Sequence, residues 1–159
     1  MRTVKNILVA ASVVIVMLVA AQKSYAHCEI PCGIYEDTLR IEMISEDITT
    51  IEKSMNQINA LSSEGEKNYN QLVRWVINKE EHAVKIQDIV SQYFLHQRIK
   101  VTDPADVEAY AKYTNQLALL HQLAVLSMKA KQSTDLAIIE QLRTTLAKFS
   151  KSYFHTHEH

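Results

Sequence analysis

The chain has 159 residues, of which 47% are hydrophobic and 22% are charged, while glycine and proline number only two each. This composition excludes a disordered chain and an all-β fold with many turns, and it favours a single helix-rich domain. A formal net charge of −1 gives no reason to expect nucleic acid or an anionic membrane surface as a partner.

The first 26 residues have the three parts of a secretory signal peptide. Two basic residues precede the apolar run ILVAASVVIVMLVAA, and Ser24 and Ala26 place small side chains where a signal peptidase cuts. The run is shorter than the roughly 18 to 20 residues of a membrane-spanning helix, so we expect cleavage, with an uncleaved anchor as the alternative. We therefore expect signal peptidase and the export machinery as partners, a periplasmic or secreted product, and His27 as its first residue.

From Asp37 onward, apolar residues recur every three or four positions, which predicts α-helices. A first helix is predicted over 37–62, and a second over about 67–100 follows the break SSEGE, with a bend or split allowed. Their predicted apolar stripes are Ile41, Ile44, Ile48, Ile51, Met55 and Ile58 in the first helix, and Leu72, Val76, Ala83, Ile86, Val90 and Tyr93 in the second.

A third helix is predicted to begin at Asp103-Pro104, because Asp103 can cap free N–H groups and proline suits a first turn. It runs to about Lys131, and a fourth helix follows from about Thr134. Residues 37–153 are thus predicted to form an all-α, antiparallel four-helix bundle. The predicted stripes are Val107, Tyr110, Thr114, Leu117, His121, Ala124 and Met128 in the third helix, and Ile139, Leu142, Leu146, Phe149 and Tyr153 in the fourth.

Histidines inside this predicted bundle show no metal-binding pattern. His121 falls on an apolar stripe, where a core histidine bonded to a neighbour is commoner than a ligand. His82 and His96 lack the i, i+4 spacing that brings two imidazoles to one metal. The end of the chain, residues 154–159, reads FHTHEH; its histidines could bind a metal, but a flexible, solvated tail is the commoner case and is our prediction.

The segment HCEIPCGIY, residues 27–35, contains both cysteines of the chain. After cleavage, His27 offers an α-amine whose unperturbed pKa is about 7.7 to 8.0, so a metal can displace its proton near neutral pH. The Cys28 amide nitrogen closes a five-membered chelate ring with that amine, and the Cys28 thiolate closes a second ring. Proline and glycine on either side of Cys32 allow the chain to turn, so that its sulfur completes a square of two nitrogens and two sulfurs.

This donor set favours nickel. Zinc prefers a tetrahedron of four side chains, whereas a tetragonal site with deprotonated nitrogen suits Ni(II) or Cu(II), and thiolates tend to reduce Cu(II). The imidazole of His27 remains available as an axial ligand for a trivalent ion, which makes one-electron chemistry accessible.

The segment resembles the nickel hook, H-C-x-x-P-C-G-x-Y, of nickel-containing superoxide dismutases. The resemblance implies a homohexamer of four-helix bundles, one nickel ion per chain, and disproportionation of superoxide to O2 and H2O2. It also implies that Tyr35 orders superoxide and water without binding nickel, that Tyr93 is the second active-site tyrosine, and that Glu42 accepts a hydrogen bond from the axial imidazole. The sequence departs from the family pattern at His82, where an arginine is expected after Lys79-Glu80-Glu81.

Two other functions use the same residues. The cysteines could form a disulfide that staples a turn in a structural bundle, and a metal-storage bundle could use the hook together with the C-terminal histidines. Thiol-redox chemistry fits less well, because its cysteines are usually separated by two residues. A histidine beside a predicted cleavage site and the tyrosine at position 35 favour the nickel enzyme.

Overall fold

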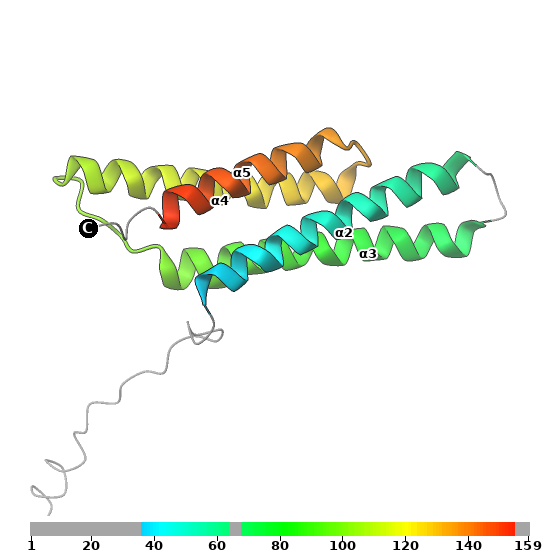
Figure 1. Cartoon of the computed structure of the whole chain (residues 1–159), viewed down its shortest axis with the longest axis horizontal. Coiled ribbons are helices and arrows are strands. Elements are labelled where there is room, and N and C mark those ends of the chain that lie inside the picture. Colours follow the sequence, from blue (N-terminus) through cyan, green and yellow to red (C-terminus); the bar gives the residue numbers. More distant parts are fainter. Residues whose placement is uncertain (1–35, 64–67, 155–159) are drawn as a thin grey trace, which may run out of the picture.

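The computed structural model describes residues 36–63 and 68–154, which form a bundle of long antiparallel helices (Figure 1). The elements are α2 (Asp37–Ser63), α3 (Tyr69–Asp88), which continues as the π-helix η2 (Ile89–Arg98), α4 (Val107–Gln132) and α5 (Ala137–Phe154). Helix α2 packs along α3, and α4 packs along α5 (Figure 1). The predicted all-α four-helix bundle is confirmed.

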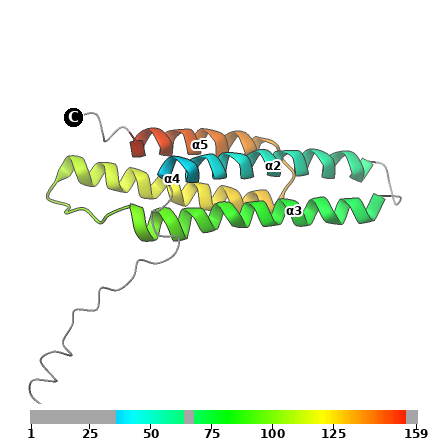
Figure 2. The ribbon, with the colours of Figure 1, turned by 60° about the horizontal axis from the view of Figure 1, so that its bottom comes forward.

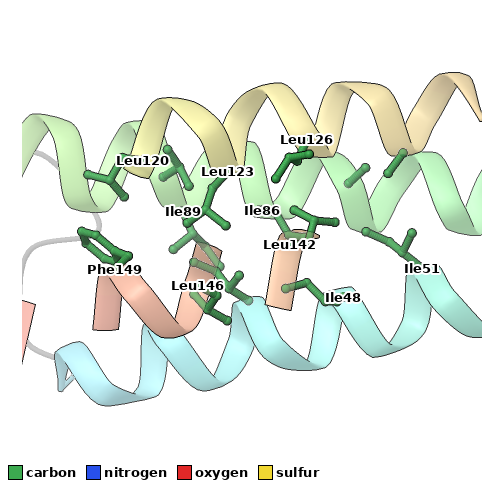
Figure 3. Close-up of a cluster of buried hydrophobic side chains, with 14 of the residues drawn as sticks. Ile48, Ile51, Ile86, Ile89, Leu120, Leu123, Leu126, Leu142, Leu146 and Phe149 are labelled. Atoms are coloured by element: carbon green, nitrogen blue, oxygen red, sulfur yellow. The ribbon is translucent and has the colours of Figure 1, made fainter. Parts of the chain in front are cut away.

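All the helices of the bundle, including the π-helix η2, contribute side chains to one hydrophobic core (Figure 3). The stripe predicted for α2 is confirmed, since Ile44, Ile48, Ile51 and Met55 are fully buried. The stripe of α5 is confirmed in the same way, and it ends at Phe149 and the partly buried Tyr153. At about 25 cal/mol per Å² of apolar surface, this burial is the main stabilising contribution to the bundle.

The stripe predicted for α4 is wrong. Val107 is 78% exposed, and His121, expected in the core, is exposed in an open groove of about 540 Å³ between α4 and α5. The sequence LALLHQLAVLSM is apolar on more than one face of a helix, so spacing alone did not identify the buried face. The residues of α4 that are buried are Gln116, Leu119, Leu120, Leu123, Leu126, Ser127 and Ala130.

The start of α4 also differs from the prediction. The N-cap is Asp106, whose carboxylate accepts a hydrogen bond from the Ala109 N–H at 3.0 Å. Asp103 instead accepts from the Ala105 N–H at 2.9 Å within the preceding turn. Two Asp residues three positions apart both fit the sequence signature of a cap, and the structure selects the second.

The substitution Asp106→Ala is therefore expected to lower the free energy of unfolding by about 1 kcal/mol, because the first turn of α4 loses its side-chain acceptor. Asp103→Ala is the matched control, and we expect it to have a smaller effect. Urea denaturation of both variants measures the difference. Equal losses, or a larger loss for Asp103→Ala, would contradict the assignment of the cap.

The second predicted helix changes its hydrogen-bonding pattern near residue 89. In η2 the turns are wider, and at its end the Ile99 N–H donates to the Phe94 carbonyl, five residues earlier, at 2.9 Å. The consecutive residues Tyr93 and Phe94 are both fully buried. The ring of Phe94 meets that of Phe149 edge-on, with centroids 4.9 Å apart, so η2 is joined to α5 by aromatic packing.

The C-terminal end of α4 is closed by a lysine from another helix. Lys79 of α3 is 4% exposed, and its Nζ donates to the carbonyl oxygens of Ala130, Lys131 and Ser133 at 2.8, 2.6 and 3.2 Å. Burial lowers the pKa of Lys79 by penalising its charged form, and Glu80, 3.9 Å from Nζ, partly offsets this. The ammonium thus takes the place of a C-terminal glycine cap at this helix end.

The helix pair α2–α3 is longer than the pair α4–α5. The C-terminal end of α2 and the N-terminal end of α3 extend beyond the connection between α4 and α5 in both views (Figures 1 and 2). Exposed apolar side chains lie on this part of α3, where Tyr69 is 59%, Val73 54% and Ile77 50% exposed. Val76, predicted to be in the core, is 37% exposed there, because no helix of the α4–α5 pair covers it. In the part of the chain that the structure describes, no helix is long and apolar enough to cross a membrane.

Candidate metal centre

The predicted nickel ligands His27, Cys28 and Cys32, together with Tyr35, lie outside the described residues. The structure does describe the point at which this segment joins the bundle, since α2 begins at Asp37, two residues after Tyr35. Two residues of chain span at most about 7 Å, so the surroundings of Asp37 are the part of the bundle nearest the hook.

Three side chains converge on the Asp37 carboxylate. The hydroxyl of Tyr93 donates to Oδ1, while Arg98 Nη2 and the hydroxyl of Tyr153 donate to Oδ2 at 2.6 and 2.7 Å. Tyr93 and Arg98 come from η2, and Tyr153 comes from α5. We call these four residues the Asp37 cluster. It joins the first turn of α2 to two other elements, at the end of the bundle that carries the hook.

Tyr93, predicted as the second active-site tyrosine, is thus placed beside Asp37, two residues after the last residue of the predicted hook. Its ring is fully buried, and the Arg40 guanidinium carbon lies 4.8 Å from the ring centroid. Whether Tyr93 contacts substrate stays a prediction. The sequence reasoning missed Asp37, Arg98 and Tyr153: the aspartate resembled an ordinary helix start, and Tyr153 resembled an ordinary member of the α5 stripe.

The electrostatics of the Asp37 cluster favour an ionised carboxylate and neutral phenols. Partial burial raises the pKa of Asp37, but the hydrogen bonds from Arg98, Tyr93 and Tyr153 and the arginine charge outweigh it and lower the pKa below its ordinary value of 3.8. Burial, together with the hydrogen bond to this anion, raises the pKa of Tyr93 and raises that of Tyr153 to about 12. At neutral pH both tyrosines therefore remain hydrogen-bond donors.

Because the folded-state pKa of Asp37 is depressed, its stabilising contribution is fully present above the unfolded-state pKa and is lost as pH falls through the folded value. We expect the wild type to exceed Asp37→Asn in free energy of unfolding by about 1 to 2 kcal/mol at pH 7. This difference should shrink once the pH falls below 3.8. Urea denaturation of both proteins between pH 7 and pH 3 checks this, and a difference that grows on acidification would contradict it.

Glu42, predicted to accept a hydrogen bond from the axial imidazole, is exposed on α2. It lines a groove of about 360 Å³ between α2 and α5, which also includes Arg143 and Ser150. Its carboxylate is therefore accessible, and its role toward His27 stays a prediction because His27 lies outside the described residues.

His82, which stands where the family pattern has an arginine, is paired with Asp47 across the α2–α3 interface. Its Nδ1 lies 2.6 Å from Asp47 Oδ1, and the side chains are 18% and 9% exposed. Burial raises the pKa of Asp47, and the contact with the histidine lowers it by a smaller amount. In this protein the departure from the pattern thus supplies an interhelical contact.

Among residues 36–63 and 68–154, no group of three or more His, Cys, Asp or Glu side chains is arranged to hold a metal ion. The donors of the hook fit nickel by their chemistry, since an amine, an amide nitrogen and two thiolates suit a tetragonal ion. The Asp37 cluster adds an anion, an arginine and two neutral phenols at the start of α2, two residues after the last residue of the predicted hook.

A comparison with protein families decides the assignment. The model of the family described as "Nickel-containing superoxide dismutase" matches residues 22–157, a range that includes the whole hook and nearly all of the bundle. The chain belongs to the nickel-containing superoxide dismutase family. It is an oxidoreductase that uses nickel to disproportionate superoxide. Neither the curated proteins nor the solved structures provide a significant match.

Proposed function

We propose that each mature chain holds one nickel ion through His27, Cys28 and Cys32. The observation that carries this proposal is that the family match includes the complete hook, HCEIPCGIY. When bound, nickel supplies a Ni(III)/Ni(II) couple for one-electron transfer in both directions. The chain's own residues would hold it through the amine, amide nitrogen, two thiolates and imidazole of His27, Cys28 and Cys32.

The tyrosines have a separate role in this proposal. Disproportionation consumes two protons for each peroxide formed, and an open surface site suits a small anion that reacts near the diffusion limit. Tyr35 orders superoxide and water through its hydroxyl. Tyr93 keeps its proton at neutral pH and donates it in a hydrogen bond to Asp37. Glu42 orients the imidazole of His27.

We further propose that the protein is exported and acts as a homohexamer in the periplasm or outside the cell. The signal-peptide pattern of the first 26 residues supports export. The exposed apolar side chains on α3, including Tyr69, Val73 and Ile77, support self-association, because contiguous exposed apolar surface is typical of interfaces.

The experiment compares the mature protein, beginning at His27, with the same protein carrying one extra N-terminal glycine. Extension converts the amine into a second amide, so we expect nickel content to fall from about one ion per chain and superoxide turnover to be lost. Native mass spectrometry measures nickel content and subunit number together. Equal nickel content and turnover in the extended protein would remove the amine from the ligand set, and nickel binding without turnover would favour storage.

A further inference from the structure

The first turns of α2 are held differently from the rest of the helix. The buried residues of α2 begin only at Ile44, seven positions after Asp37. Before that point, Leu39 and Met43 are 41% and 37% exposed, and Ile41 is only partly buried. Helix ends fray where few apolar contacts hold them, so the first two turns of α2 need another attachment.

The Asp37 cluster provides this attachment. One carboxylate accepts three hydrogen bonds, two of them on the same oxygen, and one donor is charged. The donors are themselves held in place, because Tyr93 is fully buried and the ring of Tyr153 packs 5.5 Å from that of Phe94. A side chain that receives several hydrogen bonds from buried partners is fixed in position rather than free to rotate.

We propose that Asp37 is a positioning residue for the nickel hook: it fixes the first turn of α2 on η2 and α5, and so fixes the point from which the hook leaves the bundle. This inference rests on the proposed nickel hook. The ligands of a tetragonal site must be held in the correct geometry to retain their ion, and a fraying helix would add freedom to the chain that carries Cys32.

The test uses Asp37→Asn in the mature, nickel-loaded protein. The amide keeps the size of the side chain but loses its charge and one acceptor oxygen. We expect nickel release to an excess of chelator to become about tenfold faster. We also expect faster amide hydrogen exchange in residues 37–43 and a broader electron paramagnetic resonance line of the oxidised nickel centre, a spectroscopic change that a loss of global stability alone would not produce.

Glu36→Gln is the matched control, because it removes the same charge one residue closer to the hook from an exposed side chain. We expect it to release nickel at the wild-type rate. If Asp37→Asn matches the wild type in its rate of nickel release, its amide hydrogen exchange and its paramagnetic resonance line width, the inference is overturned and the proposed function stays intact. A wild-type protein that binds no nickel would overturn both.

Should Asp37→Asn fail to fold, Tyr153→Phe is the second test, because it keeps the ring and removes the hydroxyl that donates to Asp37 Oδ2 at 2.7 Å. We expect nickel release about threefold faster than in the wild type, as one of three donors is lost. An unchanged rate in this variant would overturn the inference.

Discussion

Cys32→Ser and Cys28→Ser are each expected to reduce superoxide turnover by about 100-fold or more, with loss of nickel in the same proportion. A serine hydroxyl does not ionise near neutral pH and is a hard oxygen donor, so it does not replace a thiolate on nickel. Turnover and nickel content of the purified mature variants measure the effect. The far-ultraviolet circular dichroism should stay as in the wild type, because neither cysteine belongs to the helices that the structure describes, from Asp37 to Phe154.

These variants also separate the enzyme from a disulfide-stapled bundle. If the cysteines were joined, both substitutions would lower the melting temperature, and the denatured, metal-free wild type would contain no free thiol when oxygen is excluded. The nickel hook instead requires two free thiols in the denatured, metal-free wild type. It also requires that the substitutions leave the melting temperature of the metal-free protein unchanged. Turnover that survives either substitution would contradict the hook.

Lys79→Met is expected to have the largest effect on stability within the bundle, a loss of about 2 to 4 kcal/mol in the free energy of unfolding. Three carbonyl groups at the end of α4 lose a charged donor. Methionine also removes the desolvation cost of the ammonium, so the loss is smaller than the sum of three charged hydrogen bonds. Thermal unfolding measures this loss, and the melting temperature should fall by roughly 4 °C for each kcal/mol.

Lys129→Met is the control for this substitution. Lys129 lies in the last turn of α4, the helix whose end Lys79 caps, and its side chain is exposed. The substitution therefore removes a positive charge from the same helix end without removing a buried donor. A charge near a helix C-terminus contributes only about 0.3 to 1 kcal/mol when exposed, so the control should change stability little. Similar losses in the two variants would show that Lys79 acts through its charge alone and would contradict its role as a cap.

The bundle could be predicted because its two clearest helices have one apolar stripe each. Ile44, Ile48 and Ile51 in α2 have polar neighbours on the other faces, so their spacing identifies the buried side. The buried face of α4 could not be identified in this way, since it includes Gln116 and Ser127. These residues are satisfied by hydrogen bonds to the carbonyls of Ser152 and Leu123, and such partners are known only once the helices are packed.

The metal ligands can be argued from the sequence alone, because chelation by neighbouring groups at a chain end depends on covalent spacing. They stay a prediction, since His27, Cys28 and Cys32 lie outside the described residues. The surrounding residues depend on packing. Tyr153 reaches Asp37 across 116 positions of sequence, and Lys79 reaches Ala130 across 51. No periodicity or short motif contains a signal for such contacts, so the Asp37 cluster and the lysine cap became visible only in the folded chain.

The contact between Tyr153 and Asp37 also affects how the protein should be handled. Because the last turn of α5 lies beside the start of α2, any purification tag fused after His159 is attached to the end of the bundle that carries the hook. A polyhistidine sequence there would compete for nickel and give misleading metal contents. The C-terminal end of α2 and the N-terminal end of α3 lie at the opposite end (Figure 1), and a label or affinity peptide inserted between them would be remote from the Asp37 cluster.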